Sequence, residues 1–134
     1  LRDVYKRQPQ DDPGLIHDGT EDQIQQWLSN NIHTILPLSC ISREFPTENG
    51  PVDLLVQSKE VPILAEVKRT AMSDSVHQLQ RYLDGSEVKQ GFIIAMDMRP
   101  SARKRAEKYN IPWVEIEKSD EGFIVKEKSS DFEY

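Results

Sequence analysis

The sequence predicts an α/β domain in which helices and strands follow the order α-β-β-β-α-β-α-β-β. Three stretches carry the apolar spacing or the end signals of helices. Six short runs of β-branched, aliphatic or aromatic residues are typical of strands. The 134 residues, of which 37% are hydrophobic and 30% charged, suit one globular domain that buries a core.

The expected domain covers residues 19–128, and the two ends of the chain lie outside it. The chain begins with Leu1 rather than Met, which indicates a fragment or a processed product, and residues 1–10 have no periodicity and carry no fold prediction. The residues that follow are rich in Pro, Gly and Asp, so 1–18 are expected to form a disordered or non-native leader and linker. Residues 129–134 are expected to be a frayed tail.

The first helix is expected to start at Thr20, because Gln23 three residues later completes a capping-box pattern. Apolar side chains recur behind this start at helical spacing, at Ile24, Trp27, Leu28 and Ile32. Glu21 falls on the same inward face and has two interpretations. It is either a first-turn acid that complements the helix dipole or a carboxylate that points at the acidic pair described next.

A strand at 38–45 leads into a β-hairpin at 50–69, which is the most informative stretch of the sequence. If the chain turns at 59–60, Asp53 faces Glu66 across the two strands. Alternation predicts one apolar face, made by Val52, Leu54, Val56, Ile63, Ala65 and Val67. The opposite face is expected to carry Asp53, Glu66 and Lys68 at the open end, and Leu55 and Leu64 nearer the turn.

The expected register brings two carboxylates face to face. Opposed residues of adjacent strands lie roughly 5 Å apart at Cβ, so the carboxylates of Asp53 and Glu66 would repel each other. Strand interiors also tend to exclude both residue types. A divalent cation between them would turn repulsion into attraction, because hard ions such as Mg²⁺ take oxygen ligands. The alternative interpretation is a solvated hairpin end with incidental charges.

A second helix is expected from Ser73 or Asp74 to Leu83, closed by Gly85. Two polar side chains stand one turn apart beside its apolar stripe, Gln78 and Tyr82. Taken alone, such a pair is weak support for a site, because helix surfaces carry such pairs by chance.

The remaining elements are a buried strand at 91–96, a helix at 101–110 and two strands at 113–117 and 123–127. The helix is expected to turn Ala102, Ala106 and Tyr109 inward. A basic cluster gathers on and just before it, made by Arg99, Arg103, Lys104, Arg105 and Lys108. The cluster is either a solvated face or part of a surface that binds nucleic acid.

Charge and cysteine content narrow the class of protein. The net charge of −6 argues mildly against nucleic-acid binding over the whole surface, but the concentrated basic residues leave room for one basic zone. The single cysteine, Cys40, excludes an internal disulfide and suits a reducing cytosol. No apolar run approaches the roughly 20 residues of a membrane span, so no membrane partner is expected.

Six residues, in order and on the expected elements, resemble the motifs of the PD-(D/E)XK nuclease superfamily, and more narrowly its RecB-like group with a Gln-x-x-x-Tyr helix. They are Glu21, Asp53, Glu66, Lys68, Gln78 and Tyr82. Within that group the chain is most similar to the nuclease domain of NucS/EndoMS endonucleases, over about residues 19–118. It departs from the superfamily pattern because Val52 separates Pro51 from Asp53. It departs from NucS/EndoMS because no N-terminal dimerisation and DNA-binding domain is recognisable.

The resemblance implies a restriction-endonuclease-like mixed β-sheet flanked by helices, and Mg²⁺- or Mn²⁺-dependent hydrolysis of phosphodiester bonds in DNA. It implies as metal ligands Glu21, directly or through water, Asp53, Glu66 and the backbone carbonyl of Val67. It implies as catalytic residues Asp53, Glu66, Lys68, Gln78 and Tyr82, with Lys68 acting on the attacking hydroxide or the phosphorane. Gln78 and Tyr82 are expected to orient Lys68 and a DNA phosphate. The expected contacts to the DNA backbone are Arg69, Arg81, Arg99 and Arg103.

The resemblance also implies a biological role, a cellular compartment and partners. The expected function is DNA repair on mismatched or branched DNA in the cytoplasm of a prokaryote, with a homodimer formed through an N-terminal domain missing from this chain. A sliding-clamp motif is not evident in Ser130–Tyr134. The enzyme alternative is a Holliday-junction resolvase or restriction-like nuclease, and the non-enzyme alternative is an inactive DNA-binding module of the same fold. A plain α/β scaffold would have no divalent-ion site.

Overall fold

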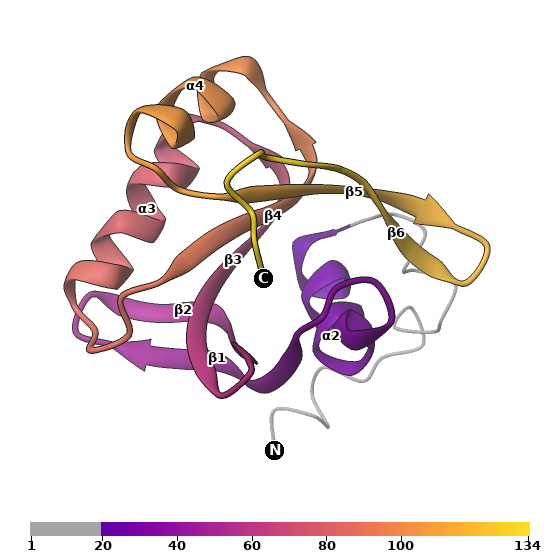
Figure 1. Cartoon of the computed structure of the whole chain (residues 1–134), viewed down its shortest axis with the longest axis horizontal. Coiled ribbons are helices and arrows are strands. Elements are labelled where there is room, and N and C mark those ends of the chain that lie inside the picture. The colour runs from indigo at the N-terminus through magenta and orange to yellow at the C-terminus, as the bar shows by residue number, and fades with distance from the viewer. Residues whose placement is uncertain (1–19) are drawn as a thin grey trace.

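A six-stranded mixed β-sheet forms the centre of the structure, a computed structural model that describes residues 20–134 (Figure 1). The strands are β1 (Ser39–Thr47), β2 (Gly50–Ser58), β3 (Val61–Ala71), β4 (Gly91–Met98), β5 (Trp113–Ser119) and β6 (Gly122–Lys128). The helices are α2 (Glu21–Asn31), α3 (Ser73–Asp84) and α4 (Pro100–Lys108), and a 3₁₀ turn, η3 (Ile32–Thr34), follows α2. The predicted order of elements is confirmed.

The strands lie in the sheet in chain order, and their connections explain their directions. β1, β2 and β3 are antiparallel neighbours, as are β5 and β6, and short turns join them. β3, β4 and β5 are parallel, because α3 and α4 return the chain before each next strand begins.

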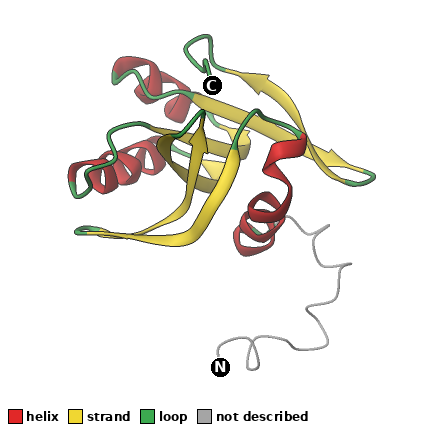
Figure 2. Cartoon of the chain, turned by 60° about the horizontal axis from the view of Figure 1, so that its bottom comes forward, coloured by secondary structure: helices red, strands yellow, loops and turns green. Residues whose placement is uncertain are grey.

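Helices cover both faces of the sheet (Figures 1 and 2). α2 packs on one face, and α3 and α4 contact each other on the other face. The side chains of β4 divide accordingly: Phe92 and Ile94 pack in the core cluster of α2, whereas Ile93 and Ala95 pack in the cluster of α3 and α4. The prediction of a strand buried on both sides is confirmed.

The β2–β3 hairpin has the predicted register, with Leu54 opposite Ala65 at the last ladder pair away from the turn. The turn residues Lys59 and Glu60 have φ angles of 51° and 71°, both in the left-handed region that a type I′ turn requires. The apolar alternation and the turn therefore fix the same register.

One side chain of the hairpin departs from the predicted alternation. Val52, expected on the face of Leu54, packs in the other core cluster, with Leu55. Two irregularities lie beside it: the β2–β3 ladder ends at Leu54, and Glu44 on β1 has a φ of 52°. A local change in backbone direction breaks strict two-residue alternation, so the prediction for Val52 was wrong.

The ends of α3 also differ from prediction. The helix begins with Ser73 itself, and Met72 precedes it as the cap, with its backbone N donating to Ser75 Oγ at 3.1 Å. Gly85 ends the helix with a φ of −97°, so no left-handed conformation is needed there. Glycine is required because a Cβ would lie 2.8 Å from the side chain of Asn49.

Two aromatic side chains near the C-terminus lie differently from the predictions. Tyr109 is 41% exposed and packs against the cations of Arg105 and Lys108 rather than facing inward. The segment expected to be a frayed tail instead inserts Phe132, which is 7% exposed and contacts Phe92 edge-on with 5.2 Å between ring centroids. The leader predicted for residues 1–18 lies outside the described residues. None of the helices within 20–134 is both long and apolar enough to cross a membrane.

Candidate active site

The acidic site lies where the β2–β3 ladder ends. Beyond the pair of Leu54 and Ala65, the side chain of Asp53 replaces the backbone as hydrogen-bond partner of β3. Its Oδ2 accepts a hydrogen bond from the backbone N of Val67 at 2.8 Å. This contact holds Asp53 beside Glu66, as the predicted register requires. Asp53 is half-buried, and Glu66 is buried with 4% of its surface exposed.

Few groups stabilise the negative charge of the Glu66 carboxylate. Lys68 Nζ lies 3.8 Å from Glu66 Oε2, whereas Oε1 is buried and meets no hydrogen-bond partner within residues 20–134. Burial, followed by the charge of Asp53, raises the pKa of Glu66 to about 9. Burial also raises the pKa of Asp53, although the bond from the Val67 N–H opposes the shift. A buried and a half-buried carboxyl group thus lie together, with the Lys68 ammonium group beside them.

Two side chains that the sequence did not single out complete this site. Gln25 on α2 is 5% exposed, and its Nε2 donates to Asp53 Oδ1 at 3.0 Å and to Glu44 Oε2 at 2.9 Å. Glu44, on β1, is exposed and has the left-handed backbone already noted. The only available signals were that Gln25 lies one turn after Glu21 and that Glu44 shortly precedes the hairpin, and neither signal is specific.

Glu21 was predicted to point at the pair of Asp53 and Glu66, but it lies apart from them. It is exposed, and its Oε2 accepts a hydrogen bond from the backbone N of Arg69 at 3.2 Å. Across residues 20–134, no group of three or more His, Cys, Asp or Glu side chains is placed to hold a metal ion. The side chain that α2 places on Asp53 is the amide of Gln25. The direct ligand role expected of Glu21 is therefore not supported.

Gln78 and Tyr82 are joined as their spacing predicts. Gln78 Nε2 donates to Tyr82 Oη at 2.5 Å, and Tyr82 is buried against the first residue of β2, where a Cβ on Gly50 would lie 3.5 Å from Tyr82 Cε1. The pair thus braces the start of the strand that carries Asp53. Within the described part of the chain, neither side chain makes a hydrogen bond to Lys68, so the idea that the pair orients Lys68 stays a prediction.

The arginines expected to contact DNA have different surroundings. Arg69 and Arg81 are exposed on β3 and α3, and Arg99 is exposed with its Nη1 3.5 Å from Asp97 Oδ2. These three side chains are accessible to a ligand. Arg103 differs, because its guanidinium group is already paired with other residues of the fold.

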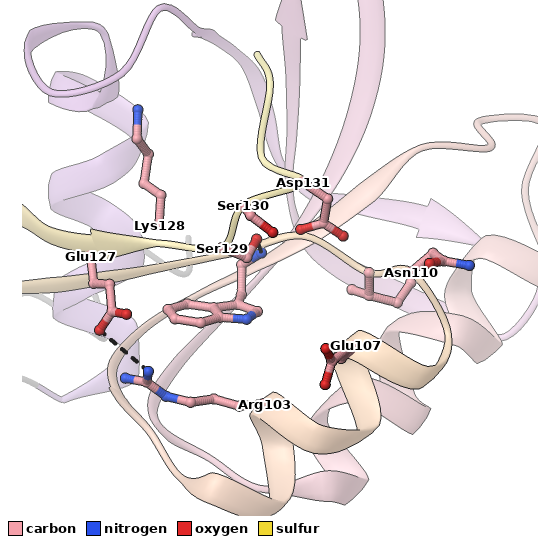
Figure 3. Close-up of a pocket in the computed structure, with 10 residues that line it drawn as sticks. Arg103, Glu107, Asn110, Glu127, Lys128, Ser129, Ser130 and Asp131 are labelled. Carbon is pink, nitrogen blue, oxygen red and sulfur yellow. Dashed lines mark hydrogen bonds and ion pairs between the residues drawn. The ribbon is translucent and has the colours of Figure 1, made fainter.

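Arg103 is held within the fold. Its Nε donates to the carbonyl oxygen of Met98 at 2.9 Å, and its two terminal nitrogens pair with Glu115 at 3.1 Å and Glu127 at 3.3 Å. Its guanidinium group stacks 4.4 Å from the ring centroid of Trp113. Figure 3 shows the bond to Glu127 at one side of a hollow of about 570 Å³ between α4 and the C-terminal segment. These contacts argue for a structural role of Arg103 rather than a contact to DNA.

We expect Arg103→Met to lower the free energy of unfolding by about 3 kcal/mol, because it leaves the buried carboxylate of Glu115 without its cation. Urea unfolding followed by circular dichroism measures the change. Lys104→Met, the same replacement at the exposed neighbouring position, should change the value by less than about 0.5 kcal/mol. Equal effects of the two replacements would contradict the structural role.

A comparison with protein families places this geometry in a known group. The family model described as "Endonuclease NucS C-terminal domain" matches residues 20–131. The chain belongs to the NucS C-terminal domain family. The resemblance to NucS/EndoMS drawn from the acidic motif and the Gln-x-x-x-Tyr helix is thereby confirmed, and a PD-(D/E)XK assignment is consistent with it.

Curated NucS proteins resemble the chain over most of its length. Endonuclease NucS of Corynebacterium efficiens is 38% identical over 114 residues, which cover 79% of this chain and 50% of the relative. Endonuclease NucS of Corynebacterium aurimucosum is 37% identical over 115 residues. The chain spans about half the length of the curated relatives it matches.

Two solved structures confirm the fold. The crystal structure of a repair endonuclease from Pyrococcus abyssi is 26% identical and superposes with a TM-score of 0.59, over 69% of this chain and 44% of that one. A structure of an EndoMS–dsDNA2 complex is 24% identical, with a TM-score of 0.63 over 71% of this chain and 43% of that one. The six-stranded sheet with helices on both faces is therefore the NucS-type arrangement.

Proposed function

We propose that the chain is the catalytic part of a DNA repair endonuclease, which hydrolyses phosphodiester bonds with the help of a divalent cation. The observation that carries the proposal is the pair of half-buried Asp53 and buried Glu66, with one Glu66 oxygen unpartnered within residues 20–134 and Lys68 beside it. Membership of a family described as an endonuclease domain supports the same conclusion. Mismatched or branched DNA is the proposed substrate.

The donor set at the pair fits Mg²⁺ or Mn²⁺. Both are hard cations that prefer carboxylate, carbonyl and water oxygens, and the carboxyl groups of Asp53 and Glu66, including the unpartnered Glu66 Oε1, offer such oxygens. Asp53, Glu66 and the backbone carbonyl of Val67 are the proposed ligands, with Glu21 linked through water. When bound, such an ion lowers the pKa of a coordinated water and offsets negative charge at the phosphate.

The remaining residues have proposed roles around this pair. The Lys68 ammonium group, held near Glu66 at 3.8 Å, would donate hydrogen bonds to the attacking water or to a phosphate oxygen whose charge grows in the transition state. Gln78 and Tyr82 would orient Lys68 and a DNA phosphate next to it. Arg69, Arg81 and Arg99 would contact the sugar–phosphate backbone, which gives salt-dependent affinity without reading sequence.

The proposal is tested by replacing the ammonium group. Lys68→Met is expected to lower the rate of Mg²⁺-dependent or Mn²⁺-dependent nicking at least about 100-fold, which is the size expected when one preorganised donor is removed. Lys59→Met, at the exposed turn of the same hairpin, should cleave as the unchanged chain does. Nicking by Lys68→Met at the rate of the Lys59→Met control, or no ion-dependent nicking by the unchanged chain, would contradict the proposal.

The same assay separates the proposed substrate from the alternatives. Mismatched, flapped, four-way and fully paired duplexes of one length are offered side by side. Preference for mismatched or flapped DNA supports a repair endonuclease, preference for four-way junctions supports a resolvase, and cleavage of paired duplex at a fixed sequence supports a restriction-like enzyme. Binding of DNA with no cleavage of any of the four supports an inactive binding module.

A further inference from the structure

Gln25 is a buried glutamine whose side-chain amide contacts two strands next to the acidic pair. It lies between Ile24, which is fully buried, and the exposed Gln26, and is itself 5% exposed. Its side-chain amide makes three hydrogen bonds to other elements, at 2.8, 2.9 and 3.0 Å. Its partners lie on both β1 and β2, so the amide links α2 to the two strands that carry Glu44 and Asp53.

Arg43 fixes which way the amide points. Its Nε donates to Gln25 Oε1 at 2.8 Å, and one of its terminal nitrogens lies 3.4 Å from Asp22 Oδ1 on the same helix. Because Arg43 can only donate, the oxygen of the amide must face it, and the amide nitrogen with its two hydrogens must face the other way. The direction of the amide thus follows from the network around it.

The amide nitrogen then serves two carboxylates at once. Asp53 Oδ1 and Glu44 Oε2 lie 3.0 and 2.9 Å from it, so one N–H is available for each. Without a donor between them, two carboxylates so placed would repel each other. Glu44 reaches this position from a backbone with a φ of 52°, a left-handed conformation that is uncommon and strained for a non-glycine residue.

Two hydrogen bonds, one to each oxygen, fix the orientation of the Asp53 carboxylate. Its Oδ2 is held by the backbone N of Val67 and its Oδ1 by Gln25. A carboxylate oxygen accepts about two hydrogen bonds or ligands, and these two donors account for one on each oxygen. The plane of the carboxylate is set by the two donors.

We propose that Gln25 is a positioning residue of the acidic site: its amide, oriented by Arg43, holds the carboxylates of Asp53 and Glu44 side by side and aims Asp53 at the gap it shares with Glu66. The inference rests on the proposed function, because it assigns a purpose to the aim of Asp53. Gln25 itself does not touch the ion or the DNA. It acts through Asp53.

The test is the affinity for Mn²⁺, measured by titration calorimetry on the purified chain. Gln25→Met keeps the size and burial of the side chain and removes all three hydrogen bonds. We expect it to weaken Mn²⁺ binding about 10- to 100-fold, which is the usual effect of removing a group that orients a metal ligand. Gln26→Met, the same replacement at the exposed adjacent position, should bind Mn²⁺ as the unchanged chain does.

Two further variants separate positioning from a general loss of structure. Arg43→Met leaves Gln25 in place but frees its amide to turn, and should weaken Mn²⁺ binding several-fold. Gln25→Met combined with Glu44→Gln removes the repulsion that the amide offsets, and should recover part of the affinity lost in Gln25→Met alone. A purely structural role predicts neither effect, because loss of packing is not restored by changing the charge of Glu44.

The outcomes distinguish this inference from the proposed function. If Asp53→Asn loses Mn²⁺ binding while Gln25→Met and Arg43→Met both keep the affinity of the unchanged chain, Gln25 is not a positioning residue and the proposed function stands. If Asp53→Asn also keeps that affinity, the proposed function itself fails. Thermal unfolding of each variant, followed by circular dichroism, identifies any that do not fold, and Arg43→Met then decides the question alone.

Discussion

Asp53→Asn is expected to lower divalent-ion-dependent DNA cleavage on the order of a thousand-fold or more, while the chain remains folded. The replacement keeps the shape of the side chain but removes the charge that the proposed ion site needs. It also leaves one oxygen for two donors, since the Val67 N–H and the Gln25 amide both point at Asp53. Relief of the repulsion between Asp53 and Glu66 offsets that lost hydrogen bond, so the fold should persist.

A nicking assay on a supercoiled plasmid measures the loss, and far-ultraviolet circular dichroism reports the fold. Asp120→Asn, in the exposed turn between β5 and β6, is the matched control and should cleave normally. Cleavage by Asp53→Asn within a factor of a few of that control would remove Asp53 from the reaction.

Glu66→Gln is expected to raise the free energy of unfolding in the absence of ions. It should also remove most of the dependence of that free energy on pH. The pKa of Glu66 is raised to about 9 from 4.5, first by burial and then by Asp53. Between these values the folded chain binds more protons than the unfolded chain, so the free energy of unfolding must fall as pH rises. The slope is at most about 1.4 kcal/mol per pH unit for this one group.

The sign of this slope, a free energy of unfolding that falls as pH rises, distinguishes Glu66 from a carboxylate whose pKa is lowered by folding. The stability that protonated Glu66 confers is fully present below pH 4.5 and is lost as pH rises through about 9. Chemical unfolding at intervals from pH 5 to pH 9 measures the slope. Glu117→Gln, exposed on β5, should retain the slope of the unchanged chain, whereas Glu66→Gln should flatten it. A flat profile in the unchanged chain would show that Glu66 ionises normally.

The parts of the fold that follow local rules were predictable from the sequence. The β2–β3 register was fixed because alternating apolar residues and a two-residue break specify the same pairing. β4 was recognisable as a buried strand because its first six residues, 91–96, are apolar without interruption. Asp53 and Glu66 could be paired on that register alone, before any resemblance was considered.

The rest of the site depends on backbone irregularity and on side chains that carry no distinctive pattern. Glu44 reaches the site through a left-handed backbone that Asn or Gly would have signalled but Glu does not. Gln25 stands beside an apolar stripe, where a glutamine usually faces solvent. Helical spacing gave Glu21 a direction but not a distance, and its carboxylate meets the backbone of Arg69, so its link to the ion through water stays a proposal.

Binding of Mn²⁺ to the chain, titrated calorimetrically at pH 7 in two buffers with different ionisation enthalpies, tests the central claim most directly. If Asp53 and Glu66 are the ligands, the ion must displace the proton that the raised pKa of Glu66 retains, and close to one proton should be released per ion bound. That release should vanish in Glu66→Gln. Failure to bind Mn²⁺, or binding with no proton released, would contradict the account.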